Sequence, residues 1–353
     1  MSNNNTMSRR KFLSVGAGAT VGAAAAIGAP AVIASRDTKF KWRMQTHWPR
    51  GTWYYEEIFQ KMADEIKAAT DGELEIETHQ PGSVVSTGDT LRAVQRGTLD
   101  SAFTWPSYWI GQIPVAGHLN GNLATWESHE EMHLFFYDMG ALDIIREAYA
   151  ARGVYQLGPY SSAGIALYSN RPVRTLEDFR GFNIRSTGTA ARVFEKMGAA
   201  PVSIGGGELY QALQTGVVDA THWGGIAAGW GMNLQEVTDY IIRPDLVAHT
   251  NGEVIINMDK WNALGSDHKQ VLDSVLRATA INSSAKFSHR DAQHMEEFVN
   301  DYDGEIIHME DEVIEQMRVH SMAVVDEVSE RDPDYSGKVG ALLHEFMEIT
   351  GKL

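Results

Sequence analysis

The chain has 353 residues, a formal net charge of −16 and no cysteine. The excess of acidic side chains argues against nucleic-acid binding and against binding to anionic membranes, and the lack of thiols excludes disulfides and thiolate metal sites. The length suits two domains, each with a hydrophobic core of its own.

The first 34 residues have the layout of an export signal. Arg9 and Arg10 precede an apolar run, rich in Ala and Gly, from Val15 to Ile33, and small residues surround a cleavage position after Ala34. The paired arginines are typical of the twin-arginine type. The run is short of the roughly 20 strongly apolar residues that a membrane span needs. We therefore predict a signal peptide over residues 1–34 and a mature protein in the periplasm, with an uncleaved membrane anchor as the alternative.

The next stretch alternates between strand and helix patterns. "KWRMQTHW" predicts a strand ending near Thr46, and a helix follows over residues 54–69 with apolar side chains on one face. "TDGELEIETH" is a turn into an alternating strand. "DTLRAVQRGTLDSAFTW" predicts a helix, a turn at Gly97 and a short strand into Trp105. This order predicts a largely parallel sheet with helices on both faces.

A second unit repeats this alternation without repeating the sequence. Strands are predicted at "GIALYSN", "FNIRST", "APVSI" and "VVDATHW", and helices at "GTAARVFEKMG" and "GGELYQALQTG". Beyond Trp261 the pattern becomes helical, over residues 267–300, 311–330 and 335–349. No low-complexity linker separates the two units, so we expect them to share crossing strands.

Five side chains follow predicted strand ends in the two units: Trp48, Trp105, Tyr108, Arg185 and Trp223. Ligands of open α/β sheets bind at the carboxyl ends of the strands. The five therefore predict one cleft between the units, with Arg185 as a clamp for an anion. The alternative for this arginine is an ordinary surface position, paired with a nearby carboxylate.

Two further motifs offer chemistry. "HEEMH", from His129 to His133, matches the H-E-x-x-H zinc-protease pattern and leaves an exported metal-dependent enzyme as the alternative function. The same segment also suits a polar helix start with apolar residues behind it. "GGGELY", from Gly205 to Tyr210, lacks the lysine of a phosphate loop and is interpreted as a strand-to-helix turn.

The segment from "TLEDFRGFNIRST" to "VVDATHW" closely resembles the solute-binding subunits of TRAP (tripartite ATP-independent periplasmic) transporters. Gly181 with Arg185, then "GAAPV" and "ELYQALQTGVVD", match the family pattern. The resemblance extends upstream through "TDGELEIETHQPGSVV" and "DTLRAVQRGTLDSAF" and downstream to "VIINMDKWNAL", which is nearly the whole mature chain. The opening "WRMQTHWPRGT" looks most like the members that bind 2-oxo acids and lactate.

This resemblance implies an α/β fold of two lobes, joined by crossing strands and by a long helix that spans both. Lobe I would comprise residues 35–160 and about 250–290, and lobe II residues 161–249 and about 291–353 with the C-terminal helices. A ligand would bind between the lobes, with Arg185 gripping its carboxylate, Tyr108 donating a phenol and Trp223 walling the pocket. Such a fork-to-carboxylate pair suits arginine better than lysine.

The resemblance also implies function and partners. The protein would capture a small organic anion and deliver it to a permease made of a small and a large integral membrane protein, without catalytic residues or cofactor. Monocarboxylates, hydroxy acids, aromatic acids and sulfonates all stay open as ligands. A monomer and a homodimer both stay open as well.

The chain departs from the resemblance at one corner. The oxo-acid and lactate members hold a bridging metal ion there with a carboxylate and an amide. This chain has His222 at the position of the carboxylate, and the position of the amide falls near Gly164 or Ile165. We therefore expect binding without a metal, because hard cations prefer oxygen ligands. His222 would contact the ligand directly, and binding would strengthen from about pH 8 to 6 if its imidazole titrates near ~6.5.

Overall fold

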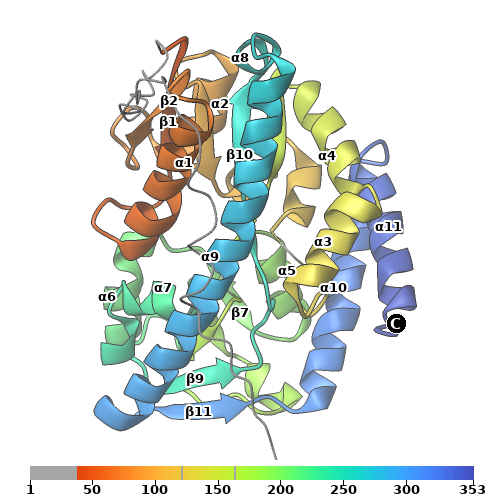
Figure 1. Cartoon of the computed structure of the whole chain (residues 1–353). Coiled ribbons are helices and arrows are strands. Elements are labelled where there is room, and N and C mark those ends of the chain that lie inside the picture. Colours follow the sequence, from red (N-terminus) through yellow and green to blue (C-terminus); the bar gives the residue numbers. More distant parts are fainter. Residues whose placement is uncertain (1–37, 121, 163) are drawn as a thin grey trace, which may run out of the picture. The chain divides into compact units, whose positions relative to one another are not determined.

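The computed structural model describes residues 38–120, 122–162 and 164–353 (Figure 1), so the predicted signal peptide lies outside the described residues. The strands are β1 (Phe40–Thr46), β2 (Leu74–His79), β3 (Ser101–Thr104), β4 (Val154–Ser161), β5 (Leu167–Ser169), β6 (Asn183–Arg185), β7 (Ala200–Val202), β8 (Ala220–His222), β9 (Tyr240–Arg243), β10 (Asn251–Asn257) and β11 (Glu305–His308). The helices are α1 (Lys61–Ala69), α2 (Thr90–Gln95), α3 (His129–His133), α4 (Ala141–Ala150), α5 (Gly188–Lys196), α6 (Leu209–Gln214), α7 (Ile226–Trp230), α8 (Met258–Asn262), α9 (Ser266–Asp301), α10 (Asp311–Arg331) and α11 (Ser336–Ile349).

Lobe I is built on a five-stranded sheet in the order β2-β1-β3-β10-β4. The predicted parallel β-α-β-α-β order is confirmed, since β1 pairs in parallel with both β2 and β3. The helix expected over residues 54–69 is present, and it begins as a π-helix, η1 (Tyr55–Gln60), before continuing as α1. The sequence did not predict β10, which enters from far along the chain and runs antiparallel to β3 and β4.

Lobe II is built on a six-stranded sheet in the order β11-β9-β5-β8-β6-β7. Strand β6, which carries Arg185, is parallel to β7 and β8, whereas β5 is antiparallel to β8 and β9. The chain passes from the first sheet to the second between Ser161 and Leu167, and it returns between Arg243 and Asn251. These two passages are the expected crossing segments.

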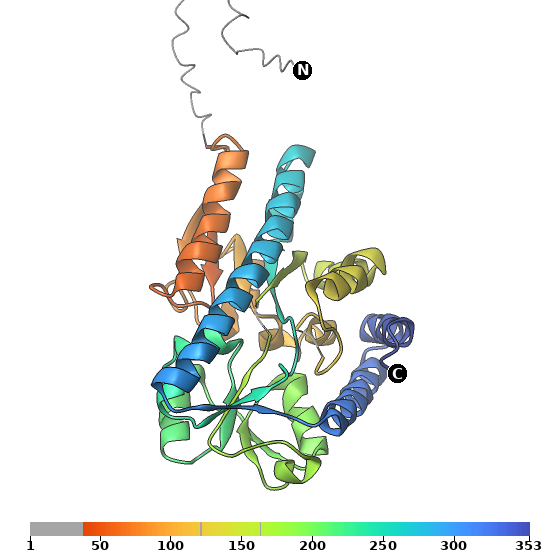
Figure 2. The same cartoon turned by 60° about the horizontal axis from the view of Figure 1, so that its bottom comes forward.

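The long helix α9 spans the two lobes. It contacts β4 and α1 at one end and α7 and β11 at the other, and Figure 1 shows it running from beside β10 down to β11. From there the chain forms β11, an edge strand of the second sheet, and then enters α10 (Figure 2). Helix α10 packs against α5 of lobe II, and α11 packs against α4 of lobe I. The predicted residue boundaries of the lobes stay predictions.

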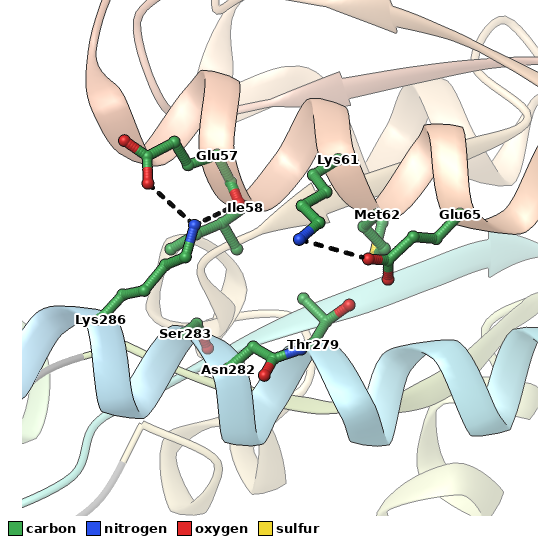
Figure 3. Close-up of a pocket in the computed structure, with 9 residues that line it drawn as sticks. All are labelled: Glu57, Ile58, Lys61, Met62, Glu65, Thr279, Asn282, Ser283 and Lys286. Atoms are coloured by element: carbon green, nitrogen blue, oxygen red, sulfur yellow. Dashed lines mark hydrogen bonds and ion pairs between the residues drawn. The ribbon is translucent and has the colours of Figure 1, made fainter. Parts of the chain in front are cut away.

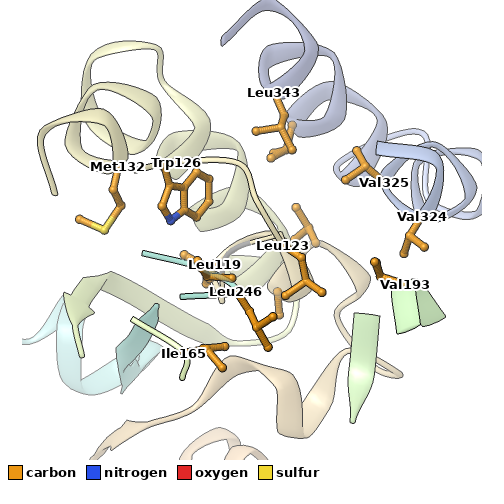
Figure 4. Packing of buried hydrophobic residues seen from close by; sticks show 14 of the residues in the cluster. Leu119, Leu123, Trp126, Met132, Ile165, Val193, Leu246, Val324, Val325 and Leu343 are labelled. Carbon is orange, nitrogen blue, oxygen red and sulfur yellow. The ribbon is translucent and has the colours of Figure 1, made fainter. Parts of the chain in front are cut away.

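One large hydrophobic cluster joins the lobes and the C-terminal helices (Figure 4). Leu119 and Leu123 of lobe I lie close to Leu246 and Ile165 of the two crossing segments, and Val193 of α5 faces Val324 of α10. Burial of such side chains stabilises the fold by about 25 cal/mol per Å² of apolar surface. The cluster therefore holds the crossing segments in place at the junction where the predicted ligand site lies. Within the described residues, no helix combines the length and the apolar character that crossing a membrane requires.

Candidate functional site

Arg185 is the last residue of β6 and lies at the junction of the lobes with only 9% of its surface exposed. Its Nε donates to the carbonyl oxygen of Ile204 (3.0 Å), and Nη1 donates to that of His222 (3.2 Å). Two backbone carbonyls therefore hold the guanidinium in place. The donors of Nη2 have no partner among the described residues, so the fork is held ready for a ligand.

No carboxylate among the described residues pairs with Arg185, although the chain has 46 acidic residues against 30 basic ones. Burial lowers the pKa of Arg185 from its ordinary value, and the neighbouring Tyr108 opposes that shift. A buried cation without a counter-ion is unfavourable by several kcal/mol. The ion-paired surface arginine that was the alternative is therefore not what the structure contains.

Trp223 follows β8 and covers the guanidinium of Arg185, whose Cζ lies 5.2 Å from the centroid of its ring. The ring in turn lies against the turn at Gly206, where a Cβ would come within 2.4 Å of Cη2 of Trp223. The "GGGELY" turn thus has a packing role as well, because a side chain at this position would displace the indole. A desolvated cation over an indole face is stabilised by about 2 kcal/mol.

His222 is buried behind Arg185, and its Nε2 lies 2.8 Å from Oγ of Ser186. Burial, together with the nearby charge of Arg185, lowers the pKa of His222 to about 3. The imidazole is therefore neutral at physiological pH. This corrects the expectation that His222 titrates near neutrality, because the sequence alone did not indicate how completely the ring is desolvated.

The corner where the resemblance implies a metal ion does not fit a hard cation. His222 offers a nitrogen that Ser186 already occupies, and Gly164 has no side chain. The carboxylate beside Gly164 belongs to Asp245, which is paired with Arg243. Calcium and sodium take oxygen ligands, and the described residues at this corner offer no free set of side-chain oxygens.

Lobe I contributes Trp105, Tyr108 and His47 to the junction. Trp105 caps the short helix η3 (Pro106–Trp109), which carries Tyr108. The Tyr108 ring is 42% exposed, and burial of its phenol raises the pKa while the charge of Arg185 opposes the shift. Tyr108 and Arg185 therefore lie close enough for each to influence the pKa of the other, although they come from different lobes.

Trp48, the remaining predicted residue, lies in the core of lobe I and is 8% exposed. Its ring packs edge-on against Tyr54, Phe103 and Tyr160, at centroid distances of 5.1 to 5.4 Å. The neighbouring His47, which the sequence analysis did not single out, lies closer to Trp105 and Tyr108. The structure thus gathers Arg185, Trp223 and His222 in lobe II opposite Tyr108 and Trp105, with Trp48 in the packing beneath.

The lobes touch beside this group. Gly188, at the start of α5, has a φ of +63°, and a Cβ there would lie 3.3 Å from Cδ1 of Ile110 in lobe I. Close by, a Cβ on Gly117 would lie 3.7 Å from Cγ2 of Thr189. The backbone after Arg185 therefore approaches lobe I closely.

The "HEEMH" segment forms α3, with Ser128 as the N-cap. His133 stacks on Tyr137 (4.6 Å between centroids), whereas His129 meets His249 edge-on at 6.3 Å. Over the described part of the chain, no group of three or more His, Cys, Asp or Glu side chains could hold a metal ion. The two histidines do not converge on a zinc site.

A separate pocket lies between η1–α1 and α9 (Figure 3). Lys286 on α9 donates to Glu57 (2.8 Å), and Lys61 pairs with Glu65 on its own helix (3.7 Å). Each lysine that faces this pocket thus has a carboxylate partner. The pocket offers no unpaired cation, in contrast to Arg185.

Comparison with known proteins places the chain in a family. Residues 44–332 match the model of the bacterial extracellular solute-binding proteins, family 7. The chain belongs to this family. The resemblance to TRAP solute-binding subunits, seen first in the segment around Arg185, is thereby confirmed.

Relatives support the same assignment. A monocarboxylate 2-oxoacid-binding periplasmic protein of Nostoc is 25% identical over 75% of this chain and 74% of its own length. The TRAP solute-binding protein of Bordetella bronchiseptica, solved with copurified calcium and picolinate, has a TM-score of 0.81 at 20% identity, covering 89% of this chain and 94% of its own. That of Pseudoalteromonas atlantica, with bound sodium and pyruvate, has a TM-score of 0.80 at 20% identity, covering 89% and 95%. These likenesses confirm the two-lobe fold of the solute-binding protein.

Proposed function

We propose that the protein captures a small organic anion between its two lobes, as the periplasmic solute-binding subunit of a TRAP transporter. The observation that carries this proposal is Arg185, which is buried, held by two backbone carbonyls and without a carboxylate partner in the described chain. A ligand carboxylate supplies the missing charge through a bidentate, charge-assisted pair.

The relatives support this ligand class. The Nostoc protein is named for monocarboxylate 2-oxoacids, and the two solved structures hold picolinate and pyruvate. The two structures also hold calcium or sodium, whereas His222 and Gly164 provide no side-chain oxygen here. We therefore propose the same class of ligand with a binding mode that uses Arg185, Trp223 and Tyr108 and no metal.

The partners follow from the family. A TRAP solute-binding protein works with a permease of a small and a large integral membrane subunit, and capture in the periplasm requires export, for which Arg9 and Arg10 support the twin-arginine route. The alternative, an exported metal-dependent enzyme, loses its support because His129 and His133 face different neighbours.

A thermal-shift screen of organic acids tests the proposal. A ligand at 100 times its Kd adds about 2.7 kcal/mol to the free energy of unfolding, which raises the melting temperature measurably. We expect small carboxylates to give the largest shifts, with their amides as uncharged controls. A screen in which amines or neutral sugars stabilise the protein and no acid does would contradict the proposal.

A further inference from the structure

His47 directly follows β1 of lobe I and carries a buried ring nitrogen that has no hydrogen-bond partner among the described residues. Its ring lies 5.8 Å from that of Trp105 and 6.1 Å from that of Tyr108, measured between centroids. Its Nδ1 is buried and has no hydrogen-bond partner among the described residues. Tyr108, on the other side, lies close enough to Arg185 for each to influence the pKa of the other. His47 thus flanks the group that contains the anion clamp.

The imidazole of His47 is uncharged. Burial lowers its pKa to about 3, and the nearby backbone of Phe103 opposes this shift. A neutral imidazole has one donor and one acceptor nitrogen. A buried polar atom left without a partner is unfavourable, so such atoms in native proteins are usually satisfied by water, protein or ligand.

The lobe I side of the junction therefore carries polar groups without charge. The imidazole of His47, the phenol of Tyr108 and the indole of Trp105 can offer hydrogen bonds or an aromatic face, but none balances an ionic group. On the lobe II side, Arg185 balances one negative charge. A second ionised group on the ligand would be buried without a counter-ion, which is strongly unfavourable.

We propose that His47 hydrogen-bonds an uncharged polar group of the ligand, and that the site therefore selects acids with one carboxylate and one hydroxyl, oxo or amide group. This inference rests on the proposed function, since it takes Arg185 as the partner of the carboxylate. It assigns each part of the ligand to one lobe, with the charge to lobe II and the neutral polar group to lobe I.

The test compares probes by titration calorimetry on the natural protein. Pyruvate, lactate and pyroglutamate carry one carboxylate and one neutral polar group, propionate lacks the polar group, and succinate has a second carboxylate. We expect at least one of the first three to bind about tenfold more tightly than propionate, and succinate to bind more weakly than that acid. Preference for propionate or succinate overturns the inference while leaving anion binding intact. If none of the five acids binds, both the inference and the proposed ligand class fail.

Variants then assign the selectivity to His47. We expect His47→Phe to reduce the preference for the polar acid over propionate about tenfold, and His47→Gln, which retains a donor and an acceptor, to keep part of it. His79→Phe is the matched control, because His79 ends the neighbouring strand β2 and pairs with Glu77. An unchanged preference in a folded His47→Phe protein overturns the inference. Should that variant not fold, the His47→Gln variant and the comparison of probes on the natural protein decide.

Discussion

The two lobes differ in the charge of the side chains that they contribute to the proposed ligand site. Lobe II brings the buried guanidinium of Arg185, which has no carboxylate partner among the described residues and is covered by Trp223. Lobe I brings neutral groups, and it even buries Glu253 in the middle of its sheet with its pKa raised to about 8. In the proposed binding mode, two similar α/β frameworks divide the recognition of one ligand: lobe II binds its charge and lobe I binds its uncharged polar group.

The largest expected effect comes from removing the charge of lobe II. Arg185→Ala should weaken binding of the acid identified by the screen more than about 30-fold, because losing one partner of a buried ion pair typically costs ~2–5 kcal/mol of binding free energy. Calorimetry measures the loss. Arg180→Ala is the matched control, since Arg180 lies on the same lobe in an exposed pair with Glu177, and its affinity should be unchanged. Affinity of Arg185→Ala within threefold of the natural protein would remove this arginine from the site.

The pH dependence of the free energy of unfolding tests whether Glu253 of lobe I is uncharged in the folded protein. Glu253 lies between Tyr149 and Gln156, and burial raises its pKa from 4.5 to about 8, so the folded protein retains a proton that the unfolded chain releases between those values. This carboxyl should therefore lower the free energy of unfolding by about 1.4 kcal/mol per pH unit as pH rises through this window. Glu253→Gln should remove that contribution and gain stability relative to the natural protein toward pH 8.

Urea unfolding at pH 5, 6.5 and 8 measures this difference. Glu77→Gln, at a half-exposed position of strand β2 in the same sheet, controls for the loss of a carboxylate at the surface. Parallel stability curves for Glu253→Gln and the natural protein would show that Glu253 is ionised in the folded state.

The protonation state of His222 tests whether the proposed site contains a second cation of lobe II besides Arg185. Because its pKa lies at about 3, the affinity for a monocarboxylate should stay constant from pH 8 to pH 6, and His222→Gln should show the same flat profile. Calorimetry at four pH values checks this. Tighter binding at pH 6 that disappears in His222→Gln would mean that the bound anion protonates the ring.

The smallest expected effect is that of metal removal. Exhaustive chelation should leave affinity unchanged, since His222 is engaged with Ser186 and Gly164 has no side chain to offer. Calorimetry before and after chelation, with calcium and sodium added back, measures it. Loss of binding that calcium or sodium restores would place an oxygen-ligated cation at this corner and add a second charge to lobe II.

The sequence predicted those parts of the fold that depend on local pattern. The parallel order of β1, β2 and β3 and the long helix α9 follow from periodicity and turn residues. Strands β9 and β11 have four residues each, and β10 pairs with a strand about 150 residues earlier in the chain. Such pairings depend on tertiary packing, which short apolar runs do not specify.

The strand-end rule anticipated the placement of some residues at the junction of the lobes and missed that of others, while their role in binding stays a prediction. The rule of strand ends found Arg185 and Trp223 because each immediately follows or ends a strand that the pattern located well. The same rule at β1 selected Trp48 and passed over His47, since the alternation of faces no longer holds once the strand has ended. His47 carried a signal nonetheless, as the polar residue between a buried threonine and a tryptophan at a strand end.

The placement of β10 between β3 and β4 has a consequence for how the protein is made. The sheet of lobe I lacks an interior strand until residue 257 has been synthesised, and the sheet of lobe II lacks β11 until residue 308. Neither core can close on a chain that is still growing through those positions, so both lobes mature nearly together, after most of the polypeptide has left the ribosome. Contacts over such separations form slowly, and until they form the edges of β3 and β4 that β10 covers are unpaired and open to pairing with other chains.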